Sequence, residues 1–110
     1  MRKIGVATEN GQVAQHFGHC PEFTIYDVKD GQVKAKTVIP NPGHQPGFLP
    51  RFLGEKGVNC IIAGGMGPSA QELFAQQNID TVIGASGPTD EVVKDYLSGD
   101  LTLGDSACHH

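Results

Sequence analysis

The chain has 110 residues, of which 38% are hydrophobic and 18% charged, an ordinary composition for one globular domain. Its net charge of −4, with eight thinly spread Lys and Arg residues, does not favour a nucleic acid or an anionic membrane as partner. No apolar run approaches the ~18 residues of a membrane helix, and Met1 leads into an expected strand, so we expect a cytoplasmic protein without a membrane partner.

The first half of the chain predicts three strands. Residues 3–8 are apolar on both faces after the first residue, and residues 22–28 alternate between apolar and polar side chains. Asp30-Gly31 then predicts a tight hairpin turn, because glycine takes the positive φ that such turns require. The returning strand covers residues 32–39 and is expected to place one set of side chains on a common face: Val33, Ala35, Thr37 and Ile39.

The segment 40–47 holds three prolines and two glycines, which predicts irregular structure. It is either a spacer or a lid that brings His44 over a ligand. The second half then alternates helices and strands. Helices are expected from Phe48 to Gly57, from Ala70 to about Asn78 and from Pro88 to Gly99, with strands at 58–63 and 79–83.

The predicted order is therefore β-β-β-α-β-α-β-α. A three-strand meander followed by strand–helix units indicates an α/β fold with a mixed five-stranded sheet and three helices, of the ribonuclease-H-like kind. The loops after the first, fourth and fifth strands should meet at one end of this sheet, where open α/β sheets bind ligands.

The first of these loops carries two imidazoles and a thiol, His16, His19 and Cys20, around Phe17 and Gly18. Each is a ligand for soft or borderline metals once deprotonated, so we predict one wall of a site for a metal or metal–sulfur species. The spacing is not the paired C-x-x-C of a closed zinc site, and an open site that accepts a preassembled cluster fits better.

Gly64-Gly65-Met66-Gly67 follows the buried fourth strand and precedes a helix. Convergent main-chain N–H groups at such a turn can hold an anion, which would make it a second wall. The alternative is that these glycines only allow tight packing between strand and helix. Phosphate-loop and dinucleotide-loop signatures are both missing.

The three cysteines, Cys20, Cys60 and Cys108, are widely spaced, which argues against a disulfide framework. Cys60 is either a buried small hydrophobe or a functional thiol. Cys108 and His109 are a candidate third wall, with a disordered end or a tag remnant as the alternative for the terminal residues.

Enzymatic activity is not expected. A nuclease on this scaffold needs acidic side chains at the tips of the central strands, but the first ends in Thr8 and the fourth in Gly64. A nucleophilic or redox role for Cys20 beside His16 or His19 stays open, although no group to orient a base is evident.

The strand 3–8, the loop 15–20, the strand 22–27 and the strand–turn segment 60–67 together resemble the dinitrogenase iron–molybdenum cofactor biosynthesis family. This family includes NifX-like carriers, the C-terminal region of NifB and small stand-alone proteins. The resemblance spans residues 1–103 as a single NifX-like cluster-binding domain, and leaves 104–110 as a flexible Cys/His tail.

The resemblance implies a ribonuclease-H-like fold without nuclease chemistry. It also implies a non-enzymatic carrier that binds, transfers or helps assemble an iron–sulfur, molybdenum–iron or molybdenum–copper sulfide cluster, with cluster donor and acceptor proteins as partners. His16, Phe17, Gly18 and the turn Gly64, Gly65, Met66 and Gly67 match the family pattern as cofactor-binding residues. Ligand roles for His19, Cys20, Cys108 and His109 are inferred from their chemistry. An anion-binding or regulatory module without metal remains the alternative.

Overall fold

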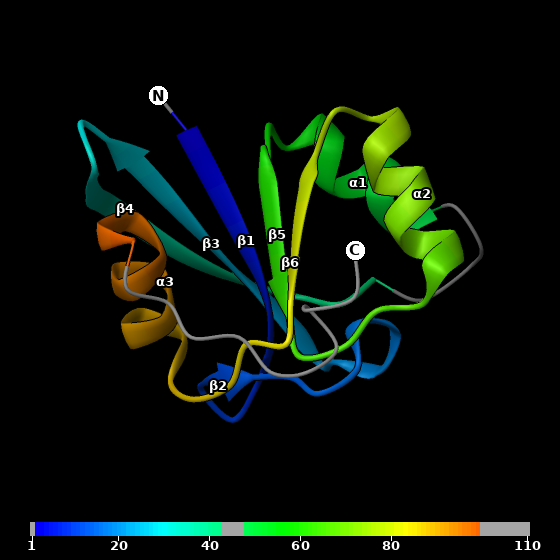
Figure 1. The fold of residues 1–110 in the computed structure, drawn as a ribbon, viewed down its shortest axis with the longest axis horizontal. Helices are drawn as coiled ribbons and strands as arrows, with labels where there is room; N and C mark the ends of the chain where they lie inside the picture. The colour runs from blue at the N-terminus through cyan, green and yellow to red at the C-terminus, as the bar shows by residue number, and fades with distance from the viewer. Residues whose placement is uncertain (1, 43–47, 100–110) are drawn as a thin grey trace.

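The computed structural model describes residues 2–42 and 48–99, with His19 described by its main chain alone. These residues form a mixed α/β fold in which helices cover both faces of one sheet (Figure 1). The strands are β1 (Arg2–Glu9), β2 (Gln12–Val13), β3 (Glu22–Lys29), β4 (Gln32–Pro40), β5 (Cys60–Ala63) and β6 (Asp80–Ile83). The helices are α1 (Phe48–Glu55), α2 (Pro68–Gln76) and α3 (Thr89–Ser98), with a short 3-10 helix, η1 (Phe17–His19).

The sheet has the order β4-β3-β1-β5-β6, and β2 pairs with β1 off this path. The central strand β1 is antiparallel to β3 and parallel to β5, which confirms a mixed sheet. Across the described residues the sheet has six strands, so the predicted count of five was wrong. The sixth is β2, whose two residues bond to Thr8 and Glu9 and are too few to show any periodicity.

Helices α1 and α2 pack on one face of the sheet and α3 on the other (Figure 1). Leu53 and Phe74 join the core on the α1–α2 side, whereas Val92 and Val93 join the core on the α3 side. The four residues of β5 are all buried, because successive side chains enter opposite cores. This burial is the physical reason for the uninterrupted apolar run in the sequence.

The β3–β4 hairpin forms as expected, with positive φ at Asp30 (54°) and Gly31 (75°). The predicted common face of β4 is wrong in one residue. A register shift makes Val33 the partner of Val28, whereas Ala35 pairs with Asp27. This β-bulge moves the Val33 side chain to the α3 side of the sheet, away from Ala35, Thr37 and Ile39.

The carboxyl ends of the parallel strands β1, β5 and β6 lie at the same end of the sheet, the lower end in Figure 1. The turn 64–67 and the segment 84–88 start from the ends of β5 and β6, and the loop 14–21 follows β2, which pairs with the last two residues of β1. None of the helices in residues 2–42 and 48–99 is long and apolar enough to cross a bilayer.

Candidate functional site

The first loop and the glycine turn lie against each other through main-chain hydrogen bonds. The Gly64 N–H donates to the Ala14 carbonyl oxygen at 2.9 Å, and the Phe17 N–H donates to the Gly65 carbonyl oxygen at 3.0 Å. Two segments almost fifty residues apart in sequence therefore form one continuous surface at the carboxyl end of the sheet.

Glycine is required where the turn meets the loop. A Cβ on Gly64 would lie 2.9 Å from the Gln15 Cα and 3.0 Å from the Ala14 oxygen. A Cβ on Gly65 would lie 2.9 Å from the Gln15 oxygen. The 2.9 Å distance at each glycine is shorter than real Cβ contacts, so these two glycines act through close packing. The Gly64 N–H is engaged by Ala14, which removes it from any set of amides that could hold an anion.

The segment after β6 completes the surface. The Gly84 N–H donates to the Gly64 oxygen at 2.9 Å, and the Val13 N–H donates to the Gly87 oxygen at 2.9 Å. The turn at Gly64 is thus held between the first loop on one side and the segment 84–88 on the other. These bonds fix the relative positions of the three segments at this end of the sheet.

His16 is an exposed residue that immediately precedes η1, with extended backbone angles (φ −130°, ψ 119°). It follows Gln15, whose main chain contacts both glycines of the turn. An exposed imidazole beside this surface can take an exchangeable position on a metal.

Phe17 fixes the loop to the protein instead of projecting from it. Its side chain is only 5% exposed, and its ring lies 5.6 Å from the Phe23 ring and 5.2 Å from the Phe74 ring, centroid to centroid. Because Phe23 is on β3 and Phe74 on α2, Phe17 connects the loop to the sheet and a helix. The described contacts of Phe17 are therefore packing contacts, and they fix the main chain next to His16.

Cys20 is a buried thiol in the same core as Phe17. Its S–H donates to the Phe17 carbonyl oxygen at 3.2 Å, and the Asn41 side-chain amide donates to the Cys20 carbonyl oxygen at 2.8 Å. Burial raises the pKa of this thiol to about 11, so it is protonated near neutral pH. A protonated buried thiol is a poor nucleophile, which argues against the redox and hydrolytic roles considered for Cys20, and its burial keeps the sulfur away from a ligand at the surface.

Cys60 is also buried, in the core beneath α3, where burial raises its pKa. The interpretation of Cys60 as a small hydrophobe is the one this environment favours.

Met66 is half buried and packs against the core on the α1–α2 side. The Gln71 side-chain amide donates to the Met66 carbonyl oxygen at 2.9 Å, which fixes the turn just before α2. Gly67 is the exposed N-cap residue of α2, and Pro68 is its first residue. The positive end of this helix therefore faces the same end of the sheet as His16.

Four candidate groups fall outside what the structure describes: the His19 side chain, His44, Cys108 and His109. The described side chains contain no cluster of three or more His, Cys, Asp or Glu residues that could hold a metal ion. The described part of the site is thus an open surface with one imidazole, and not a closed coordination sphere. The sequence did not predict the hydrogen bonds of the Asn41 and Gln71 side chains to the loop and the turn, because a single Asn or Gln forms no recognisable sequence motif.

Residues 1–99 match the model of the family described as "Dinitrogenase iron-molybdenum cofactor". This chain belongs to that family. An uncharacterized protein of Methanocaldococcus jannaschii is 33% identical over 106 residues, which cover 92% of this chain and 90% of that protein.

Solved structures agree with the fold. The crystal structure of PH0822 aligns with a TM-score of 0.89 and 26% identity, covering 98% of this chain and 99% of that one. The apo form of the orange protein of Desulfovibrio gigas aligns with a TM-score of 0.79 and 22% identity, covering 96% and 94% of the two chains. At that identity the second likeness shows the fold alone.

Proposed function

We propose that this protein is a non-enzymatic, cytoplasmic carrier that reversibly binds a metal–sulfur cluster at the carboxyl end of its sheet and passes it between partner proteins. The cargo is an iron–sulfur cluster or a molybdenum-containing sulfide with iron or copper. The family is linked by name to the iron–molybdenum cofactor. We also assign the fold to the ribonuclease-H-like class, which the strand order β4-β3-β1-β5-β6 supports.

The observation that carries this proposal is the contact between the first loop and the glycine turn. The bond from the Phe17 N–H to the Gly65 carbonyl oxygen fixes the main chain directly after His16 to the glycine turn, which supports a position of His16 beside that turn. Metal–sulfide clusters are commonly anionic, so they suit the N-terminal end of α2 and its main-chain amides. His16 supplies an exchangeable ligand. We keep as predicted metal ligands His19, Cys108 and His109. Cys20 could bind a metal only if the first loop opened.

A carrier must release what it binds, and the described residues fit that demand. One exposed imidazole and a main-chain surface hold a cluster less tightly than four thiolates would. Burial of Cys20 removes the strongest donor in the first loop from the surface. Weak, open coordination is what transfer to an acceptor protein requires.

The test is reconstitution of the purified protein without oxygen, using sulfide with iron, with molybdate, or with molybdate and copper. We expect a coloured complex with a fixed metal-to-protein ratio, and we expect His16→Ala to retain less metal after gel filtration. Gln76→Ala, an exposed change on α2 away from the loop, is the matched control. A colourless wild-type product in all three mixtures would contradict the proposal.

The alternative is a module that binds an ordinary anion and no metal. One observation favours it: the described side chains contain no group of three or more His, Cys, Asp or Glu residues that could hold a metal ion. Phosphate or nucleotide binding that is unchanged in both His16→Ala and Cys20→Ala would support this alternative over the carrier.

A further inference from the structure

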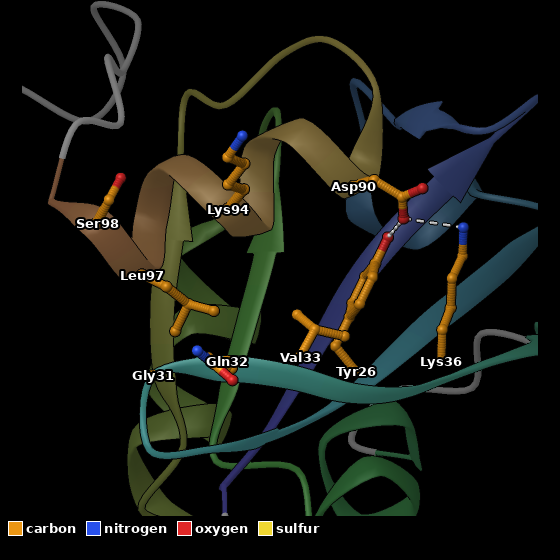
Figure 2. A pocket seen from close by; sticks show the side chains of 9 residues that line it. All are labelled: Tyr26, Gly31, Gln32, Val33, Lys36, Asp90, Lys94, Leu97 and Ser98. Carbon is orange, nitrogen blue, oxygen red and sulfur yellow. Dashed lines mark hydrogen bonds and ion pairs between the residues drawn. The ribbon is translucent and has the colours of Figure 1, made fainter.

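A groove separate from the candidate site runs between the edge strand β4 and helix α3 (Figure 2). Its volume is about 610 Å³. Tyr26 and Val33 form its floor, Leu97 faces them from α3, and Lys36 and Asp90 close one end. A second hollow of about 430 Å³ adjoins it and shares Gly31 and Leu97.

The groove exists because α3 covers the middle of the sheet and not its edge. Val92 and Val93 of α3 pack on the core that includes Ile4 and Ile62 of the central strands. Val33 and Val38 of β4 are left 43% and 50% exposed. These are two of the few large apolar side chains on the described surface, and both lie on the α3 side of the sheet by the register of β4.

β4 is the first strand in the sheet order, and no strand of the described chain pairs with its outer edge. Along the nine residues of β4, alternate residues therefore direct their main-chain N–H and C=O groups away from β3 and toward an incoming strand, except that Pro40 has no N–H. Edges of this kind bind extended peptides by adding a strand, with alternate side chains entering the neighbouring groove.

The charge around this edge is opposite to the net charge of the chain. Lys34 and Lys36 lie on β4 and Lys94 on α3, and the adjoining hollow adds Arg2 and Lys29. These are five of the eight basic residues in a chain of net charge −4. The acidic residues that line the groove and the adjoining hollow are Asp90, which lies 2.9 Å from the Lys36 ammonium and 2.7 Å from the Tyr26 hydroxyl, and Asp30, so basic residues outnumber acidic ones here.

The lysines also disfavour a second copy of this chain as the occupant. Two β4 strands paired about a two-fold axis near their centre would place Lys36 opposite Lys36 or Lys34 of the other copy. Like charges directly opposite each other destabilise a strand pair, so the edge selects a partner with acidic residues there.

We propose that the edge of β4 and the groove beside it are the docking site for an extended, acidic segment of a partner protein. The partner strand has apolar, acidic and apolar side chains at alternate positions, opposite Val38, Lys36 and Val33. β4 ends at Pro40, and the next residue, Asn41, bonds to Cys20 at the foot of the first loop. A docked strand would thus lead toward the candidate site, although docking itself needs no cluster.

The test uses a seven-residue probe, acetyl-Thr-Val-Thr-Glu-Thr-Val-Thr-amide, and a partner probe with Lys in place of Glu. The sequence is the same in both directions, so it serves parallel and antiparallel addition alike. With isotope-labelled protein, we expect the Glu probe to shift amide signals of β4 and α3. We expect it to bind about threefold more tightly than the Lys probe, as one cross-strand charge pair allows.

Lys36→Glu should reverse this preference, whereas Lys56→Glu, an exposed charge reversal at the end of α1, should leave it unchanged. Equal binding of the two probes, or shifts confined to other elements, would overturn the proposal. So would concentration-dependent shifts at β4 without peptide, which indicate a second copy, or equivalent shifts with oligodeoxythymidylate, which indicate a nucleic acid. The peptide experiment contains no metal, so it is independent of cluster binding. A negative peptide result leaves the carrier proposal unaffected, and a negative reconstitution result leaves the docking proposal unaffected.

Discussion

The main-chain N–H of Phe17 lies 3.0 Å from the carbonyl oxygen of Gly65, and this bond joins two loops that the sequence separates widely. The Phe17 ring is held in the core by Phe23 and Phe74. Its main chain therefore serves as a fixed point to which the turn at Gly65 is attached. The position of His16 relative to the turn follows from this attachment.

Gly64→Ala should destabilise the protein. The new Cβ would meet main-chain atoms of Ala14 and Gln15, which can shift only if the loop moves. We expect a loss of about 1–3 kcal/mol in the free energy of unfolding, measured by urea denaturation. Gly18→Ala is the control, since a Cβ there meets no atom within 4 Å, and its effect should stay within about 0.5 kcal/mol. Equal effects of the two variants would contradict the packing role of the turn.

Cys20 should resist alkylation in the folded protein. Because its pKa is raised to about 11, roughly 0.1% of the thiol is ionised at pH 8, and the sulfur is also buried. Iodoacetamide treatment followed by peptide mass spectrometry should label Cys20 only after denaturant is added. Rapid labelling of Cys20 in the native protein would show that the first loop opens readily.

Stability should fall between about pH 9 and pH 11. The folded state keeps the Cys20 proton over this range while the unfolded state, with a thiol pKa near 9, loses it. The stabilisation is thus complete below pH 9 and is lost as the pH rises through the folded pKa, on the order of 2 kcal/mol in total. Urea denaturation at several pH values should show a shallower fall for Cys20→Ala. An identical pH slope in both proteins would contradict the assignment.

Tyr26→Phe should change the ionisation of Asp90. The Tyr26 hydroxyl, 2.7 Å from the carboxylate, is the main cause that lowers the pKa of Asp90, ahead of Lys36. Removing the hydroxyl should move this pKa back toward its ordinary value, as followed by NMR titration of the carboxyl carbon. The variant should also lose about 1 kcal/mol of stability, because the buried hydroxyl bonds to Thr89 as well. Lys34→Ala is the control. It leaves the contacts of Asp90 with Tyr26 and Lys36 in place, so the pKa of Asp90 should not change.

Much of the fold could be predicted because burial leaves a pattern in the sequence. The run at 60–63 is apolar because β5 is covered on both faces, and Asp30-Gly31 forms the hairpin that its positive φ values require. β2 and η1 were not predicted because elements of two or three residues are too short to show a hydrophobic periodicity. The face of Val33 was predicted wrongly because a β-bulge shifts the alternation of side chains between the two faces of the sheet. No residue type in the sequence marks the position of this bulge.

The site was less predictable, for a physical reason. The glycine turn and the first loop were placed at the same end of the sheet, since strand order determines where such loops start. The direction of a loop side chain has no such rule. Cys20 therefore looked like an exposed ligand beside two histidines, whereas the Phe17 oxygen and the surrounding core hold it inside.

The most direct test of the carrier proposal is to locate a bound metal sulfide on the protein. Tetrathiomolybdate, a soluble molybdenum sulfide anion, can be titrated without oxygen into isotope-labelled protein while the amide spectrum is recorded. We predict shifts concentrated at residues 15–18 and 64–67, with the edge of β4 unaffected. Saturation without any shift in these two segments would contradict the proposal that they form the cluster site.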